Sequence, residues 1–225
     1  MNWLKQEWNK LKGLSAKQKI EYIWDYYKLW LIGLVSLVLV SGYLLDNYKN
    51  ANKEINIYVA FVNTFADIGE GSAFWKGYAE ENGIDTNSIN ITFDTNNYFD
   101  MTQNNVTGNH YYEKLVVVAD SEMLDAVVLE PENLAALGSG GRLIDLRDKR
   151  TDELMHKYAD RIITTQYTDE NGTVCEIPVG IDISDSILVT KEAAYDRCAL
   201  GISANTQHVE AVEAFLSYIL EEEEE

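Results

Sequence analysis

Proline, cysteine and histidine are scarce in this chain: 225 residues contain two prolines, two cysteines and three histidines. No proline-rich or Gly/Ser-rich linker divides the part that follows residue 53, so we expect a single domain there. No C-x-x-C pair is present and the histidines are far apart, which excludes the usual spacing of a metal site. The sequence therefore predicts no metal centre.

Catalytic motifs are also missing. The chain contains no G-x-S-x-G, no H-E-x-x-H and no P-loop, the patterns that mark nucleophile elbows, zinc proteases and phosphate-binding loops. We therefore expect a protein that is not an enzyme and that needs no cofactor. The remaining enzymatic hypothesis is an exported hydrolase in which Cys175 pairs with a distant histidine.

Basic residues are few and unevenly placed. The chain has 18 Lys and Arg against 37 Asp and Glu, a net charge of −19. Residues 1–53 carry a balance of +4 and residues 54–225 a balance of −23. Nucleic-acid affinity depends on Lys and Arg that neutralise phosphates, so the acidic part argues against a nucleic-acid partner.

One long hydrophobic run organises the sequence. Leu29–Leu45 holds seventeen residues with no charge and no proline, about 25 Å of helix at 1.5 Å per residue. It predicts a transmembrane helix whose partner is the lipid bilayer. Most nearby lysines precede the run, so the positive-inside rule predicts a single-pass protein of the cell membrane with a cytoplasmic N-terminus and an extracellular C-terminal domain. A cleaved signal peptide and a buried soluble helix are the rival interpretations.

The segments that flank the run have their own patterns. Residues 1–28 are predicted to form a cytoplasmic amphipathic and juxtamembrane helix, with Ser15 and Gln18 as a capping box. Residues 46–53 are predicted to be a polar linker. The acidic residues 221–225 are expected to be a solvated tail.

Residues 54–220 alternate between strand and helix patterns, which predicts an α/β domain with a mixed sheet. The predicted strands are Ile55–Val62, Ile89–Phe93, Leu124–Leu129, Arg142–Leu146, Ile162–Thr168, Thr173–Ile177, Val179–Ile183, Ile187–Val189 and Ala199–Ser203. The predicted helices are 72–82, His110–Ala119, Pro131–Leu137, Thr151–Arg161 and Gln207–Leu220. For His110–Ala119 a strand is the alternative, because Val116–Val118 are β-branched. Asn171 and Gly172 predict a hairpin turn between two of the strands.

Both cysteines, Cys175 and Cys198, lie in the acidic part. If that part is outside the cell, an oxidising compartment permits a disulfide between them. Two buried free thiols are an equal alternative.

Three motifs resemble the solute-binding proteins of bacterial ABC importers, which have the type II periplasmic-binding fold. The matching segments are Asp125-Ala126 with Gly141–Leu146, Asn171-Gly172 with Ile177–Gly180, and Gly201–Asn205 with Glu213–Leu220. The anchor segment Tyr22–Lys28 resembles that of uncharacterised single-pass proteins of Gram-positive bacteria. The resemblance implies a reduced, membrane-anchored relative whose α/β domain corresponds to one periplasmic-binding lobe.

Ligands of open α/β sheets bind at the carboxyl ends of the strands. This rule nominates three groups of ligand-binding residues, which are Asn63 and Thr64, then Glu130, Glu132 and Asn133, and then Asp182, Ser184 and Asp185. Glutamates already occupy the start of the helix at Pro131, so the expected ligand is a neutral or cationic small solute. The alternative is that the glutamates only complement the helix dipole and that the Asp182 segment is a loop bonded to its own backbone.

Two functional hypotheses follow. In the first, the chain is a membrane-anchored extracytoplasmic binding protein for a small solute. In the second, it is an interaction or scaffold subunit of a cell-envelope complex, without a small-molecule ligand. A solute binder predicts a polar pocket, and an interaction subunit predicts an exposed apolar patch.

Overall fold

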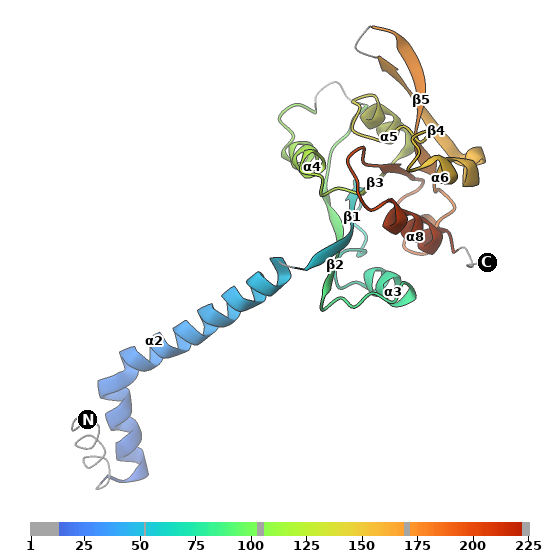
Figure 1. The fold of residues 1–225 in the computed structure, drawn as a ribbon. Coiled ribbons are helices and arrows are strands. Elements are labelled where there is room, and N and C mark those ends of the chain that lie inside the picture. The colour runs from blue at the N-terminus through green and yellow to red at the C-terminus, as the bar shows by residue number, and fades with distance from the viewer. Residues whose placement is uncertain (1–13, 52, 103–105, 169–171, 222–225) are drawn as a thin grey trace. The chain divides into compact units, whose positions relative to one another are not determined.

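The computed structural model describes residues 14–51, 53–102, 106–168 and 172–221, and the chain forms two compact units that meet between Lys53 and Glu54. The predicted amphipathic segment before residue 14 and the tail after Glu221 lie outside the described residues. Figure 1 shows the elements of each unit.

In the described residues of the first unit, one long helix, α2, spans Ala16–Ala51. Its start has the predicted capping box, because the Ser15 amide donates to Gln18 Oε1 at 3.0 Å and the Gln18 amide donates to Ser15 Oγ at 3.4 Å. Within it, Lys28–Leu45 is long and apolar enough to cross a membrane. The first six residues of the predicted linker at 46–53 are helical, because α2 continues to Ala51.

The second unit contains a single mixed sheet of six strands in the order β2-β1-β3-β6-β5-β4. The strands are β1 (Glu54–Val62), β2 (Ile89–Asn97), β3 (Ala126–Leu129), β4 (Ile162–Thr168), β5 (Val174–Asp182) and β6 (Ala199–Ile202). Strands β2, β1 and β3 are parallel, and β6, β5 and β4 continue the sheet with antiparallel pairs. The predicted α/β class with a mixed sheet is confirmed.

Two helices of this unit begin at side-chain caps. Ser72 accepts a hydrogen bond from the Trp75 amide at the start of α3, and Asn109 accepts from the Tyr111 and Tyr112 amides at the start of α4. The helices are α3 (Ala73–Glu81), α4 (His110–Asp120), α5 (Pro131–Gly138), α6 (Asp152–Lys157), the 3₁₀ turn η1 (Ala159–Arg161), α7 (Ile187–Thr190) and α8 (Val209–Leu220).

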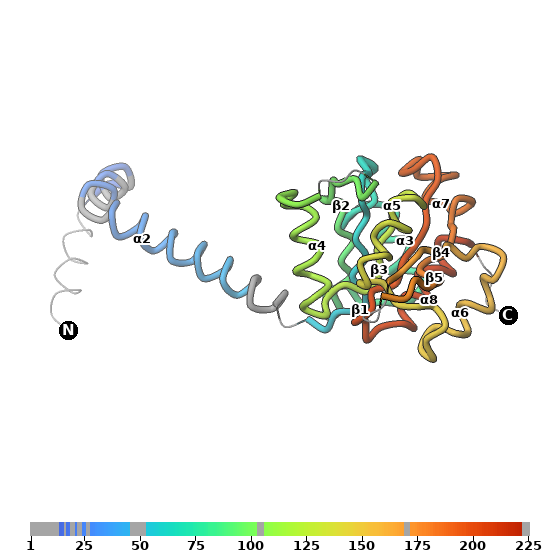
Figure 2. Tube along the Cα trace, turned by 90° about the horizontal axis from the view of Figure 1, so that it is seen from above, coloured from blue at the N-terminus to red at the C-terminus, as the bar shows by residue number. Residues whose placement is uncertain are grey.

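Each face of the sheet is covered by helices (Figures 1 and 2). Side chains alternate along β1, so Val59 and Phe61 enter one core and Ala60 and Val62 enter the other. The first core is completed by α3 and α8, and the second by α4 and α5. This three-layer arrangement explains why β1 and β3 are apolar at consecutive positions, since both of their faces are buried.

Two glycines allow α5 to lie close to the sheet. A Cβ atom on Gly180 of β5 would lie 2.2 Å from Leu134 Cδ2, and one on Gly201 of β6 would lie 2.7 Å from Leu134 Cδ1. Leu134 is fully buried, so its side chain occupies the space that the two missing side chains leave.

Two predicted strands are wrong. Arg142–Leu146 forms only an isolated bridge, between Leu143 and Ser203. The apolar run after Ser186 is the short helix α7, because the Val189 and Thr190 amides turn back to the Ser186 carbonyl. The residues Ser184–Ser186 before that run favour a helix start over an extended chain.

Candidate functional site

The carboxyl ends of β1 and β3 bring three of the predicted site residues together. Asn63 Nδ2 lies 3.4 Å from Glu130 Oε2, and Asn133 Nδ2 lies 3.2 Å from the same oxygen. Asn63 also donates to the Phe99 carbonyl at 2.9 Å, and its Oδ1 accepts from the Phe99 amide at 3.1 Å. Asn63 adopts a positive φ of 59°, a conformation that asparagine tolerates better than most residues.

The other polar groups at this edge are bonded to the protein itself. Asn133 Oδ1 accepts from the Met101 amide at 2.6 Å. Thr64 is buried and donates to the Ala194 carbonyl at 3.0 Å. Glu132 forms an ion pair with Arg197. These bonds join the loops after β1, β2 and β3 to one another, which makes this edge a cross-linked structural element.

The third predicted group is a turn. The Ser184 amide donates to Asp182 Oδ1 at 2.8 Å, and Ser184 Oγ donates to the Cys198 carbonyl at 3.3 Å. Asp185 pairs with Arg161 at 2.5 Å. Asp182 and Ser184 thus bond to nearby backbone, as an Asx-type turn does.

The two cysteines are both free thiols, so the disulfide alternative is not realised in the structure. Cys198 is buried, as the second alternative predicts, whereas Cys175 is exposed on β5. Burial raises the pKa of the Cys198 thiol to about 12. Cys198 is therefore an unreactive core residue, and the proposed nucleophile Cys175 has no described hydrogen bond to a histidine.

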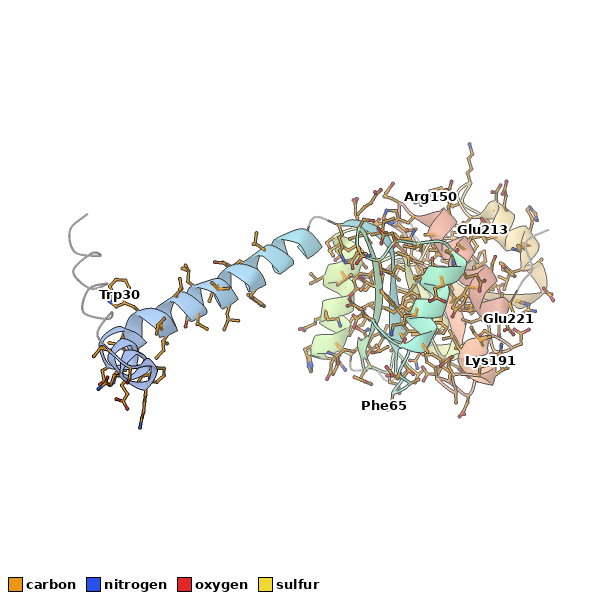
Figure 3. The ribbon with its side chains drawn as sticks, turned by 90° about the horizontal axis from the view of Figure 1, so that it is seen from below. Trp30, Phe65, Arg150, Lys191, Glu213 and Glu221 are labelled. Carbon is orange, nitrogen blue, oxygen red and sulfur yellow. The ribbon has the colours of Figure 1, made fainter. Side chains whose placement is uncertain are left out.

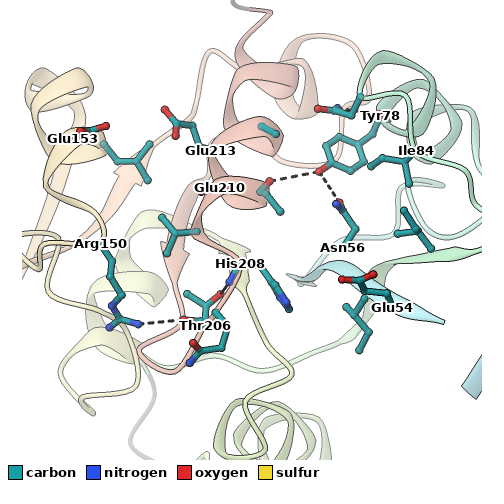
Figure 4. Close-up of a pocket in the computed structure, with 18 of the residues that line it drawn as sticks. Glu54, Asn56, Tyr78, Ile84, Arg150, Glu153, Thr206, His208, Glu210 and Glu213 are labelled. Carbon is teal, nitrogen blue, oxygen red and sulfur yellow. Dashed lines mark hydrogen bonds between the residues drawn. The ribbon is translucent and has the colours of Figure 1, made fainter. Parts of the chain in front are cut away.

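A groove of about 870 Å³ lies at the opposite end of the domain. It is formed by the amino ends of β1 and β2, the start of α8 and the segment 149–154. Figure 3 shows Phe65, from the loop after β1, and Arg150, from the groove, at opposite ends of this unit. Figure 4 shows the side chains that converge on the groove.

Acidic side chains outnumber basic ones around the groove. The acidic residues are Glu54, Asp152, Glu153, Glu210 and Glu213, and the basic ones are Lys149 and Arg150. His208 also lines the groove. Arg150 is engaged by the protein, because its guanidinium donates to the Thr206 and Ala204 carbonyls at 3.1 and 3.2 Å and pairs with Asp148 at 3.1 Å. The field inside the groove therefore favours a cation.

His208 is held by a fully buried carboxylate. Its Nδ1 lies 3.1 Å from Asp125 Oδ1, which also accepts from Thr206 Oγ1 at 2.5 Å. The other oxygen of Asp125 accepts from the Tyr58 amide at 2.8 Å. An ionised Asp125 requires a proton on Nδ1, so in the neutral imidazole Nε2 is a hydrogen-bond acceptor. The His208 side chain is 40% exposed and lines the groove.

Tyr78 closes the far wall of the groove. Its hydroxyl lies 3.3 Å from Asn56 Oδ1 and 3.5 Å from the Ala211 carbonyl (Figure 4). Burial, together with the negative charge of Asp125, raises the pKa of Tyr78, so its hydroxyl stays protonated at neutral pH. The groove thus combines carboxylates, a histidine, an amide and a phenol.

The sequence pattern did not nominate these residues. The rule for α/β sheets directs attention to the carboxyl ends of strands, whereas the groove lies where β1 and β2 begin. One signal was available, because Asp125 is a charged residue within the apolar run Leu124–Leu129, and a buried carboxylate needs hydrogen-bonding partners.

Comparison of the chain with protein-family models, curated proteins and solved structures finds no match. The resemblance to solute-binding proteins therefore stays a prediction.

Proposed function

We propose that this chain is a membrane-anchored binding protein that holds a small, polar, amine-bearing solute in the groove between β1, β2 and α8. The observation that carries the proposal is the set of five carboxylates around a groove of about 870 Å³, a volume typical of small-molecule sites. Glu54 and Glu210 supply negative charge for the amine, and His208 Nε2 accepts a hydrogen bond from a neighbouring donor group.

In this proposal α2 anchors the protein in the cell membrane, the N-terminus is cytoplasmic and the domain is extracellular. The support is the apolar stretch Lys28–Leu45 together with the lysines that precede it. In this proposal the protein binds the solute and does not transform it.

Thermal unfolding of the full chain with millimolar putrescine, glucosamine or glucose tests the proposal. We expect the two amines to raise the unfolding temperature and glucose, which has no amine, to have little effect, because a ligand that binds only the folded state stabilises it by mass action. The double variant Glu54→Gln/Glu210→Gln should lose this response. The matched control Glu80→Gln/Glu113→Gln removes the same charge from exposed helix positions outside the groove and should keep it. Equal responses in the two variants would contradict the proposal.

A second candidate function is the interaction subunit of a cell-envelope complex. The specific observation is Phe65, which is 91% exposed and stacks on Tyr98 with ring centroids 5.2 Å apart. An exposed phenylalanine that stacks on a half-buried tyrosine is typical of a protein contact. This function predicts that neither amine stabilises the chain and that Phe65→Ser leaves its stability unchanged.

A further inference from the structure

The strand β4 ends the sheet and has a free outer edge. It pairs with β5 along its whole length, from Ile162↔Ile181 to Thr168↔Val174. On its other side, no strand of the described part of the chain pairs with it. Successive residues of a strand point their N–H and C=O groups to alternate sides, so about every second residue of β4 presents a backbone donor and acceptor that can extend the sheet.

The outer half of the β4–β5 hairpin projects as a two-stranded arm (Figure 1). Strand β5 pairs with β6 only at Ile181↔Leu200 and Asp182↔Ala199, so Gln166–Thr168 and Val174–Glu176 lie beyond the six-stranded part. Val174 is 61% exposed there. A two-stranded ribbon is marginally stable in water, and added strands stabilise it.

The two edges of the sheet differ in protection. At the edge strand β2, Lys114 Nζ donates to the Asn96 carbonyl at 3.0 Å and pairs with Asp94 at 2.6 Å. A lysine at a sheet edge is a common device against unwanted strand pairing. Strand β4 has the sequence IITTQYT, with no lysine, no proline and no charge. The edge of β4 thus lacks the protection that β2 has.

Charge also distinguishes β4 from the rest of the domain. Residues 54–225 carry a balance of −23, so two copies repel each other over most of their surfaces. A strand without charge is a place where two such domains can approach, and antiparallel pairing of β4 with itself brings no like charges opposite each other.

We propose that β4 pairs antiparallel with β4 of a second copy of this chain about a two-fold axis, which joins the two six-stranded sheets into one. A seven-residue strand is about 24 Å long, and its contact is smaller than a standard interface of about 1,600 Å². The pairing therefore depends on the high effective concentration of chains held in one membrane. It is independent of the groove.

Cysteine scanning in membranes tests this pairing. Single cysteines replace Thr164, Thr165, Gln166, Tyr167 and Thr168 in turn, in full-length chains that carry Cys175→Ser. Buried Cys198 is kept. Copper–phenanthroline then oxidises the membranes, and the yield of disulfide-linked dimer is read on a non-reducing gel. Asn96→Cys, exposed on the protected edge strand β2, is the matched control.

Antiparallel pairing about a two-fold axis predicts that the yield of disulfide-linked dimer has one maximum along β4. The residue on the axis directly faces its own copy in the second chain. A residue one position away from the axis is separated from its own copy by two positions, about 7 Å along the strand. That offset exceeds the span of a disulfide. Gln166→Lys should lower the peak yield about fivefold by placing like charges near the axis, whereas Asn96→Lys should leave it unchanged.

Two results would overturn the proposal. One is the absence of dimer at all five positions. The other is a yield that is uniform along β4 and equal to that of Asn96→Cys, since random collision in the membrane would produce it. Neither result bears on the stabilisation by amines, so failure of this pairing and failure of the proposed function are distinguishable.

Discussion

His208 Nδ1 lies 3.1 Å from Oδ1 of Asp125, a carboxylate with no exposed surface. Asp125 also accepts from the Tyr58 amide and from Thr206 Oγ1, so it connects β1, the start of β3 and the segment before α8. A buried carboxylate with this many partners fixes three parts of the fold at the wall of the groove.

Replacement of Asp125 should destabilise the domain strongly. Asp125→Ala leaves the partly buried Tyr58 amide without its acceptor and removes the partner of His208, which we expect to cost about 2–4 kcal/mol of the free energy of unfolding. Urea unfolding of residues 54–225, which hold the complete sheet and both cores, measures the change. Exposed Asp120→Ala is the control, with an expected change of about 0.5 kcal/mol or less. Equal stability of the two variants would show that the Asp125 contacts contribute little.

Alkaline pH should lower the stability of the domain. Burial raises the pKa of Cys198 from 9.0 to about 12 in the folded state. The unfolded chain therefore releases this proton first, and the stabilisation is complete below pH 9 and lost as pH rises toward 12, by about 1.4 kcal/mol per pH unit. Tyr218, whose pKa burial raises to about 12, contributes with the same sign. Urea unfolding across this range gives the free energy of unfolding as a function of pH. This free energy should fall less steeply with pH in Cys198→Ala, by the contribution of about one proton. An identical slope would contradict the prediction.

Gly180→Ala should destabilise the contact between α5 and the sheet. Its Cβ atom would lie 2.2 Å from Leu134 Cδ2 and 2.8 Å from the Leu200 carbonyl oxygen, and the backbone atom cannot rotate away. We expect a loss of about 1–3 kcal/mol in the free energy of unfolding. Gly69→Ala is the matched control, because its new Cβ would meet no atom closer than 3.6 Å. A Gly180→Ala protein as stable as the control would show that α5 can move.

Cys175 is a built-in reporter of membrane orientation. It is exposed, whereas Cys198 is buried. If the domain is extracellular, a membrane-impermeant maleimide should label one thiol per chain in intact cells, and Cys175→Ser should abolish this labelling. Labelling that requires disruption of the membrane would place the domain inside the cell.

The spacing of apolar residues predicted the main helices and strands because, in these elements, the local sequence signals agree with the pattern of burial. Strand β1 and the helices α3, α4 and α8 occur near their predicted positions, where caps such as Ser72 and Asn109 coincide with apolar patterns. Strand β2 extends beyond its predicted end at Phe93 to Asn97. In this case pairing with β1 and a buried Asn97 override the turn-like composition of its last residues.

The partners of side chains far apart in sequence could not be predicted. Asp125 and His208 are 83 residues apart, and only the strand order β1-β3-β6 brings them together. Asn63 and Glu130 lie at neighbouring strand ends, as the sequence suggests, but the bonds that they make to each other and to Phe99 depend on loop geometry. Pattern therefore predicts which residues end a strand and does not predict which of them remain available to a ligand.

The entry of the chain into the domain has a mechanical consequence. Glu54, the first residue of β1, follows Lys53 directly, so any tension carried by α2 is applied to β1. This strand is paired on one side with β2 and on the other with β3. Extraction of β1 along its axis would shear its hydrogen bonds to β2 and to β3 together. The domain should therefore resist pulling through α2 better than pulling through α8.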